Sequence, residues 1–191
     1  MTDLVWHRGA EPSIGDRRTS STISKWRRGT YEEDTLAGDL VRLGGDWSIL
    51  SGAHCGVPAI DFIIIGPSGV FVIDSRIMAH RNIFVDENQL LINGVPIDTV
   101  LDIRMAALSI SSTLTVTTGE IVNVKPVIVV PEEASVEFGG NPDLRTTVVH
   151  ADRLTRWLVD GPQALSAQAV SYFTMVAEER DTWGASSGSA A

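Results

Sequence analysis

The chain has 191 residues, 43% of them hydrophobic, and a formal net charge of −9 at pH 7. This length fits a single domain that buries its own core. No apolar run reaches the roughly 18 residues that span a bilayer, and the first ten residues lack the apolar core of a signal peptide. A single cysteine, Cys55, excludes an internal disulfide and a cysteine zinc site. These features predict a cytoplasmic protein without a membrane partner.

Charge is distributed unevenly along the chain. Residues 1–28 hold six Lys or Arg and three Asp or Glu, a net charge of 6 − 3 = +3, so the remainder carries −9 − 3 = −12. This lead-in is irregular and predicts a basic, flexible N-terminal arm, which either contacts DNA phosphates or a protein partner, or stays a solvated tail. Residues 29–183 are expected to form the α/β domain. Residues 184–191 are small and predict a disordered tail.

Apolar residues recur at helical spacing in several segments. In the first of them Leu36, Leu40 and Leu43 form one stripe, and Gly44 with Gly45 ends the helix. A shorter helix is expected to begin with Asp152 as its cap. The three longer predicted helices are Tyr31–Leu43, Asp98–Thr117 and Ser166–Glu179.

Short β-branched or aromatic runs bounded by turn residues predict strands between these helices. Residues 131–142 are expected to form an acidic loop. The order of helices and strands predicts a mixed α/β layer fold. The predicted strands are Trp47–Leu50, Phe62–Ile65, Val70–Ile73, Ile83–Val85, Gln89–Ile92, Val122–Val130 and Thr146–Val149.

The most informative stretch runs from residue 60 to 77 and reads I-D-F-I-I-I-G-P-S-G-V-F-V-I-D-S-R-I. Two apolar runs flank a Gly-Pro-Ser-Gly turn, which predicts a hairpin of two buried strands. Asp61 opens the first strand and Asp74 closes the second. Because the start of one antiparallel strand lies beside the end of the next, both carboxylates should sit at the same end of the hairpin.

Two carboxylates at the edge of an apolar sheet are costly unless a cation joins them. A hard divalent ion such as Mg²⁺ is the candidate, and Arg76, two residues after Asp74, adds a cation on the same strand face. Such a set suits phosphodiester cleavage. The structural alternative is that both Asp residues cap turns at strand ends, where Asp is common.

The same stretch resembles the core of the nuclease-related domain, NERD, a family similar to the PD-(D/E)XK nucleases. The resemblance rests on an Asp before a hydrophobic strand, a G-P-x-G turn, and a strand V-F-V-I-D followed by one residue and a cation. Glu33 and the leucines after it resemble the first helix of the family, and residues 125–130 resemble a later central strand. The resemblance covers about residues 29–160 and implies an α/β, restriction-endonuclease-like mixed sheet flanked by helices.

By this resemblance Asp61 and Asp74 would ligate Mg²⁺, with Glu33 helping, in a Mg-dependent deoxyribonuclease. The sequence departs from the family at three positions. Arg76 stands where Lys is expected, Phe62 where His often follows the first Asp, and Met105 where the second helix carries Gln. Arg can stabilise phosphate charge, but it does not deprotonate and so cannot act as a base.

Two functions follow from these observations. The first is a nuclease-related domain that either hydrolyses phosphodiesters with the help of a metal or interacts with DNA. Its catalytic activity would be weak or absent. The alternative is a catalytically dead copy of the fold that serves as a structural or protein-interaction module, with protein partners or a homo-oligomer. Lys125 could supply a displaced amine, and the four histidines show no metal-ligand spacing.

Overall fold

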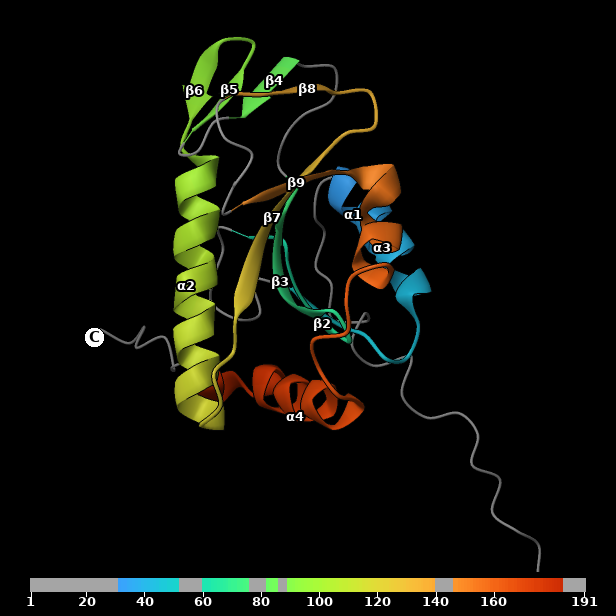
Figure 1. Ribbon diagram of the computed structural model, residues 1–191, viewed down its shortest axis with the longest axis vertical. Coiled ribbons are helices and arrows are strands. Elements are labelled where there is room, and N and C mark those ends of the chain that lie inside the picture. The colour runs from blue at the N-terminus through green and yellow to red at the C-terminus, as the bar shows by residue number, and fades with distance from the viewer. Residues whose placement is uncertain (1–30, 52–59, 76–81, 86–88, 140–145, 184–191) are drawn as a thin grey trace, which may run out of the picture.

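The computed structural model describes residues 31–51, 60–75, 82–85, 89–139 and 146–183. The predicted arm, the predicted tail, Cys55 and Arg76 lie outside these ranges. The described chain folds into three layers, with a main sheet between helices on both sides (Figure 1). The helix α2 (Thr99–Thr118) runs along one side, and α1 (Tyr31–Leu40) and α3 (Ala151–Val159) lie on the other. The predicted α/β class with a mixed sheet flanked by helices is confirmed.

The main sheet has five strands in the order β1-β2-β3-β7-β9. The first three strands form an antiparallel meander, and β7 and β9 join β3 in parallel. The carboxyl ends of β3, β7 and β9 therefore share one edge of the sheet, which we call the carboxyl edge. The strand bounds are β1 Ser48–Ser51, β2 Phe62–Gly66, β3 Gly69–Asp74, β7 Val124–Val130 and β9 Thr147–His150.

Strands β2 and β3 are buried at every position, as expected of strands covered on both faces. Their side chains alternate between two cores. Ile63 and Val72 pack on the side of α2 and α4 (Ala167–Glu178), which we call the α2 face. Phe62 and Ile73 pack on the opposite side against α1 and α3, which we call the α3 face.

The predicted hairpin is confirmed, with Phe62 paired to Ile73 and Gly66 paired to Gly69. Its turn is fixed to the C-terminal part of the domain. The Ser68 hydroxyl donates a hydrogen bond of 2.7 Å to the Leu158 carbonyl, and the Pro67 carbonyl accepts bonds from residues 164 and 165. The turn end of the hairpin is therefore occupied by contacts with the C-terminal part of the domain. The opposite end, at the carboxyl edge, is the end where a site can form.

A second sheet of four strands, in the order β6-β5-β4-β8, lies beyond the carboxyl edge (Figure 1). The predicted acidic loop at 131–142 is wrong in part, because residues 135–138 form β8 and pair in parallel with β4. Strand β6 was also not predicted. It follows a tight turn in which Asn93 and Gly94 both have positive φ. The strands are β4 Asn82–Val85, β5 Leu90–Ile92, β6 Val95–Ile97 and β8 Ser135–Phe138.

The helices match the sequence-based segments with small shifts. The first ends in a 3-10 turn, η2 (Val41–Leu43), and a last 3-10 helix, η3 (Arg180–Trp183), follows α4. Asp152 lies in the first turn of α3 and is not its cap, because His150 occupies that position. The cap of α4 is Ser166, whose hydroxyl accepts a bond of 3.1 Å from Ala169 N–H.

By length and composition, α2 could cross a membrane, and no other helix of the described ranges could. A core helix passes the same test. In this fold Ile103, Ala107, Ile110 and Leu114 are buried in the core between α2 and the main sheet.

Candidate functional site

Asp61 and Asp74 lie at the same end of the β2–β3 hairpin, as the sequence predicts. Asp74 is the last residue of β3, and Asp61 directly precedes β2. The N–H of Asp61 donates a hydrogen bond of 2.8 Å to the carbonyl of Ile73, the residue before Asp74. The two acidic residues are therefore brought together at the carboxyl edge by the pairing of their strands.

The side chain of Asp74 faces the core beneath α2. It has the same parity along β3 as Val70 and Val72, whose side chains pack on the α2 face. Its neighbour on β7 is Ile128, which belongs to the same core. Asp74 is completely buried, with 0% exposure. A buried carboxylate needs hydrogen bonds or a counter-charge, so the surroundings of Asp74 determine what this end of the sheet can bind.

Asp61 is held by the residue that follows Asp74. Its Oδ2 accepts one hydrogen bond of 2.6 Å from the backbone N–H of Ser75 and a second of 2.8 Å from the Ser75 hydroxyl. Two donors on one carboxylate oxygen fix the orientation of the carboxylate. Sequence reasoning passed over Ser75, because a serine after a strand gives no signal of its own.

A comparison with protein families identifies the fold around this hairpin. Residues 28–131 match the model of the nuclease-related domain, NERD, which is more than half of the chain. The chain belongs to the NERD family. No curated protein and no solved structure matches it significantly. The matched range ends just after β7, so it includes the hairpin with Asp61 and Asp74, the second helix and the central parallel strand.

Two further residues of the predicted NERD site are not placed by the structure. Glu33 lies within α1, but the described part of the chain does not include its side chain. Helix α1 packs on the α3 face through Leu36 and Leu40, whereas Asp74 faces α2. Arg76 lies outside the described ranges. The roles assigned to Glu33 and Arg76 remain predictions.

Two of the three positions that depart from the NERD pattern, Phe62 and Met105, lie in the described part of the chain, and their surroundings differ. Phe62 is fully buried in the α3-face core, and Met105 is 66% exposed on the outer side of α2.

Lys125 is ruled out as a displaced amine. It pairs with Phe71 toward the start of β7, and its Nζ lies 5.4 Å from the centre of the Phe71 ring. Phe71 packs on the α3 face, opposite to Asp74.

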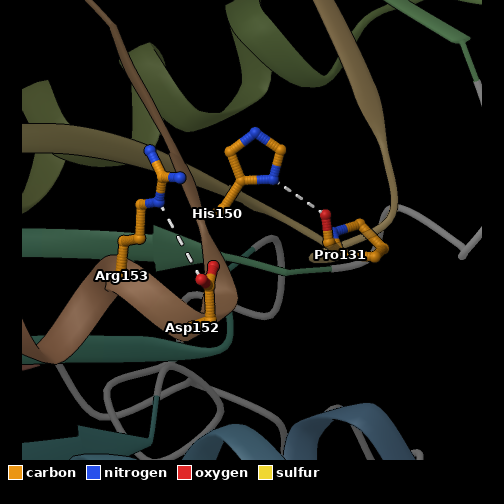
Figure 2. A network of polar contacts seen from close by, with 4 residues as sticks. All are labelled: Pro131, His150, Asp152 and Arg153. Carbon is orange, nitrogen blue, oxygen red and sulfur yellow. Dashed lines mark hydrogen bonds and ion pairs between the residues drawn. The ribbon is translucent and has the colours of Figure 1, made fainter.

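A polar contact joins the ends of β7 and β9 at the carboxyl edge (Figure 2). His150 ends β9, and its Nδ1 lies 3.0 Å from the carbonyl oxygen of Pro131, which follows β7. Figure 2 shows the imidazole turned toward Pro131, while Arg153 and Asp152 pair with each other on α3 at 3.9 Å. This contact fastens the ends of β7 and β9 together and assigns the imidazole a structural role.

Arg104 is, after Ser75, a second residue near this edge that sequence reasoning missed. It is half-buried on α2, and its Nε donates a hydrogen bond of 3.0 Å to the hydroxyl of Thr146. Thr146 precedes β9 and is 1% exposed. The two residues are 42 positions apart, so only the packing of α2 on the sheet reveals their contact.

The acidic residues of the carboxyl edge fit Mg²⁺ in part. Carboxylate oxygens are its preferred protein ligands, and Mg²⁺ commonly takes one or two of them and keeps several waters. Asp61 and Asp74 supply two such groups. Within the described ranges no set of three or more His, Cys, Asp or Glu side chains is placed to hold a metal ion. The donor set therefore suits a hydrated ion held by two carboxylates.

Proposed function

We propose that this NERD chain uses the carboxyl edge of its main sheet to bind Mg²⁺ and to hydrolyse phosphodiester bonds in DNA. One observation supports this above all: the strand pairing brings Asp61 to the same edge as Asp74, which is fully buried. The match to the nuclease-related domain makes phosphodiesters the natural substrate class.

Different residues of the chain would have different roles in this reaction. Asp74 and Asp61 would hold the ion, with Ser75 fixing the orientation of Asp61. When bound, the ion would polarise the phosphate and lower the pKa of an attacking water. Glu33 would add a carboxylate from α1. Arg76 would stabilise the charge that develops on the phosphate, without taking a proton.

DNA would reach this acidic domain through its basic arm. Residues 1–28 carry a net charge of +3, against −12 for the remainder. Lys and Arg side chains release counterions from DNA when they contact phosphates, which supplies affinity without sequence specificity. The reducing cytoplasm is the compartment that fits a chain with one cysteine.

A second function has its own support. Ser75 satisfies one oxygen of Asp61 without a metal, and the Lys of the family is Arg in this chain. Both features fit a catalytically inactive copy that serves as a protein-interaction module. In that case Asp61 and the buried Asp74 would be held by protein groups alone.

Nicking of supercoiled plasmid DNA with Mg²⁺ or Mn²⁺ tests the proposal. The unmodified chain should nick, and Asp74→Asn, which keeps the size of the side chain, should not. Asp152→Asn is the matched control, because it changes an acid on α3 that pairs with the exposed Arg153. Circular dichroism would check that all three proteins fold. Absence of nicking and of Mn²⁺ binding in the unmodified protein would favour the inactive copy.

A further inference from the structure

The helix α2 carries two charged residues, Asp102 and Arg104, among its twenty. Asp102 is exposed, whereas Arg104 is half-buried. Arg104 lies one turn from Val100 and from Ala107, which are both buried in the core beneath α2. A cation therefore sits on the side of α2 that faces the main sheet.

The direction of α2 decides where this cation points. The Ser111 hydroxyl donates a bond of 2.6 Å to the Val122 carbonyl, and the Val122 N–H donates one of 3.1 Å to the Thr115 hydroxyl. The C-terminal half of α2 thus lies beside the start of β7, and its N-terminal half lies toward the carboxyl edge (Figure 1). Helical side chains lean toward the N-terminus of their helix. Arg104 therefore leans toward the edge that carries Asp74.

Register and spacing place Asp74 within reach of this guanidinium. Asp74 is aligned with Ile128 on β7, and Ile128 is aligned with Val148 on β9. Thr146, two residues before Val148, is consequently about 10 Å across the sheet and about 7 Å along it from Asp74. One hydrogen bond of about 3 Å from the guanidinium to Thr146 and a second to Asp74, together with the width of the guanidinium and the side chains of Thr146 and Asp74, would span that separation.

We propose that Arg104 forms an ion pair with Asp74, and that this pair makes divalent-cation binding at the carboxyl edge depend on a phosphodiester. Thr146 positions the guanidinium for the pair through the Nε contact. Arg104 is a positioning residue of the site. The pair itself follows from the fold, whereas the dependence on a phosphodiester rests on the proposed function.

The dependence follows from a sum of charges. Asp61, Asp74 and Arg104 add to −1, so a divalent cation brings the site to +1 and one phosphodiester anion returns it to zero. Without Arg104 the carboxylates add to −2, and the cation alone neutralises them. Glu33 and Arg76 carry opposite charges, so including both leaves each sum unchanged. Arg104 should therefore weaken cation binding alone and strengthen binding of the cation with DNA.

A double-mutant cycle on the full chain tests the ion pair. Urea unfolding would be measured for the unmodified protein, Asp74→Asn, Arg104→Met and the double variant. We expect a coupling of about tenfold in the unfolding equilibrium constant, as contacting residues show. Additive effects would overturn the pair. If Asp74→Asn alone does not fold, adding Arg104→Met should restore folding, because no unpaired buried charge then remains. Failure of that rescue would also overturn it.

The matched control for this cycle is Arg153→Met. Arg153 is an exposed arginine on α3, whose inner residues pack on the opposite face of the sheet. Its substitution should be additive with Asp74→Asn within about twofold. If Arg153→Met coupled to Asp74→Asn as strongly as Arg104→Met does, the coupling would reflect the net charge of the protein and not a contact between Arg104 and Asp74.

Titration with Mn²⁺ tests the dependence on a phosphodiester. A nuclease-resistant phosphorothioate oligonucleotide should raise the Mn²⁺ affinity of the unmodified chain about tenfold, within the usual range of coupling between sites. Arg104→Met should bind Mn²⁺ more tightly without the oligonucleotide and gain little from adding it. Mn²⁺ binding that Asp74→Asn abolishes but Arg104→Met leaves unchanged would overturn the dependence alone. No Mn²⁺ binding under either condition would overturn the proposed function and the dependence together, and the unfolding cycle would still decide the pair.

Discussion

Ser75 holds Asp61 with two hydrogen bonds on the same carboxylate oxygen, 2.6 Å from its backbone N–H and 2.8 Å from its hydroxyl. The hairpin alone brings Asp61 to the end of β3, but it leaves the carboxylate free to rotate. The two bonds from Ser75 remove that freedom. Removing a residue that orients a metal ligand typically costs about 10–100-fold in metal affinity, so Ser75 offers a test of the proposed role of Asp61.

Ser75→Ala should separate the orientation of Asp61 from its presence. The variant keeps the backbone bond and loses the hydroxyl bond, which should lower the free energy of unfolding by about 1.5–3 kcal/mol, as for hydrogen bonds to charged groups. Under the proposed function its Mn²⁺ affinity should fall about 10–100-fold. Urea unfolding and Mn²⁺ titration measure the two effects.

Ser111→Ala is the control for this prediction. Its hydroxyl also donates one short bond, 2.6 Å to the Val122 carbonyl, but it lies beside the start of β7 and away from the carboxyl edge. It should cost about 0.5–1.5 kcal/mol and leave Mn²⁺ binding unchanged. Equal losses of Mn²⁺ affinity in both variants would mean that general destabilisation, and not the orientation of Asp61, explains the result.

Gly66 and Gly38 should respond in opposite ways to alanine. A Cβ at Gly66, the last residue of β2, would overlap the Trp47 ring, whereas a Cβ at Gly38 would meet open space on α1. Gly66→Ala should destabilise the fold by about 1–3 kcal/mol through overpacking. Gly38→Ala should stabilise it by up to about 1 kcal/mol through helix propensity. Thermal unfolding of both variants gives the sign of each effect, and a stable Gly66→Ala would contradict the close Trp47 contact.

Much of the fold follows from local sequence pattern. The hairpin was predictable because Gly66 to Gly69 form an unmistakable turn between two apolar runs, and antiparallel pairing then fixes which ends meet. Strand β8 was not predictable in the same way. Its residues S-V-E-F are largely exposed, and the strand exists because β4 offers a parallel partner. Pairing between distant segments leaves little trace in either segment alone.

The candidate site shows the same division. The position of Asp61 and Asp74 at one end of the hairpin was predictable, because Asp61 directly precedes one strand with a strong pattern and Asp74 ends the other. Ser75 and Arg104 were not found, because their roles depend on contacts with residues 14 and 42 positions away. Arg104 in particular resembles a charged interruption of an apolar helix until the packing of α2 places it over the sheet. Local sequence pattern can therefore reveal the carboxylates of a candidate site without revealing the groups that position them.

Removing residues 1–28 should weaken any DNA binding and flatten its dependence on salt. The segment carries six Lys or Arg. For each of these side chains that neutralises a phosphate, its removal should make the slope of log K against log salt shallower by about 0.9 on duplex DNA. Fluorescence anisotropy with a duplex at several salt concentrations measures the slope. Deletion of residues 184–191, which contain no charged side chain, is the control. An unchanged slope without the arm would place the DNA contacts on the domain.

Arg76→Lys tests whether the chain has lost only the amine of a nuclease site. If Asp61, Asp74 and Glu33 are otherwise in place, a compact ammonium that can approach both water and phosphate should raise Mg²⁺-dependent plasmid nicking. General acid–base groups contribute about 10²–10⁴-fold to rates, so a gain of at least about tenfold is expected. Arg153→Lys, the same change at an exposed position of α3, should have no effect. Because Arg104 is proposed to neutralise Asp74, Arg76→Lys should also leave the free energy of unfolding within about 0.5 kcal/mol of the unmodified value. A folded Arg76→Lys variant that binds Mn²⁺ but nicks no faster would show that the amine is not what the site lacks.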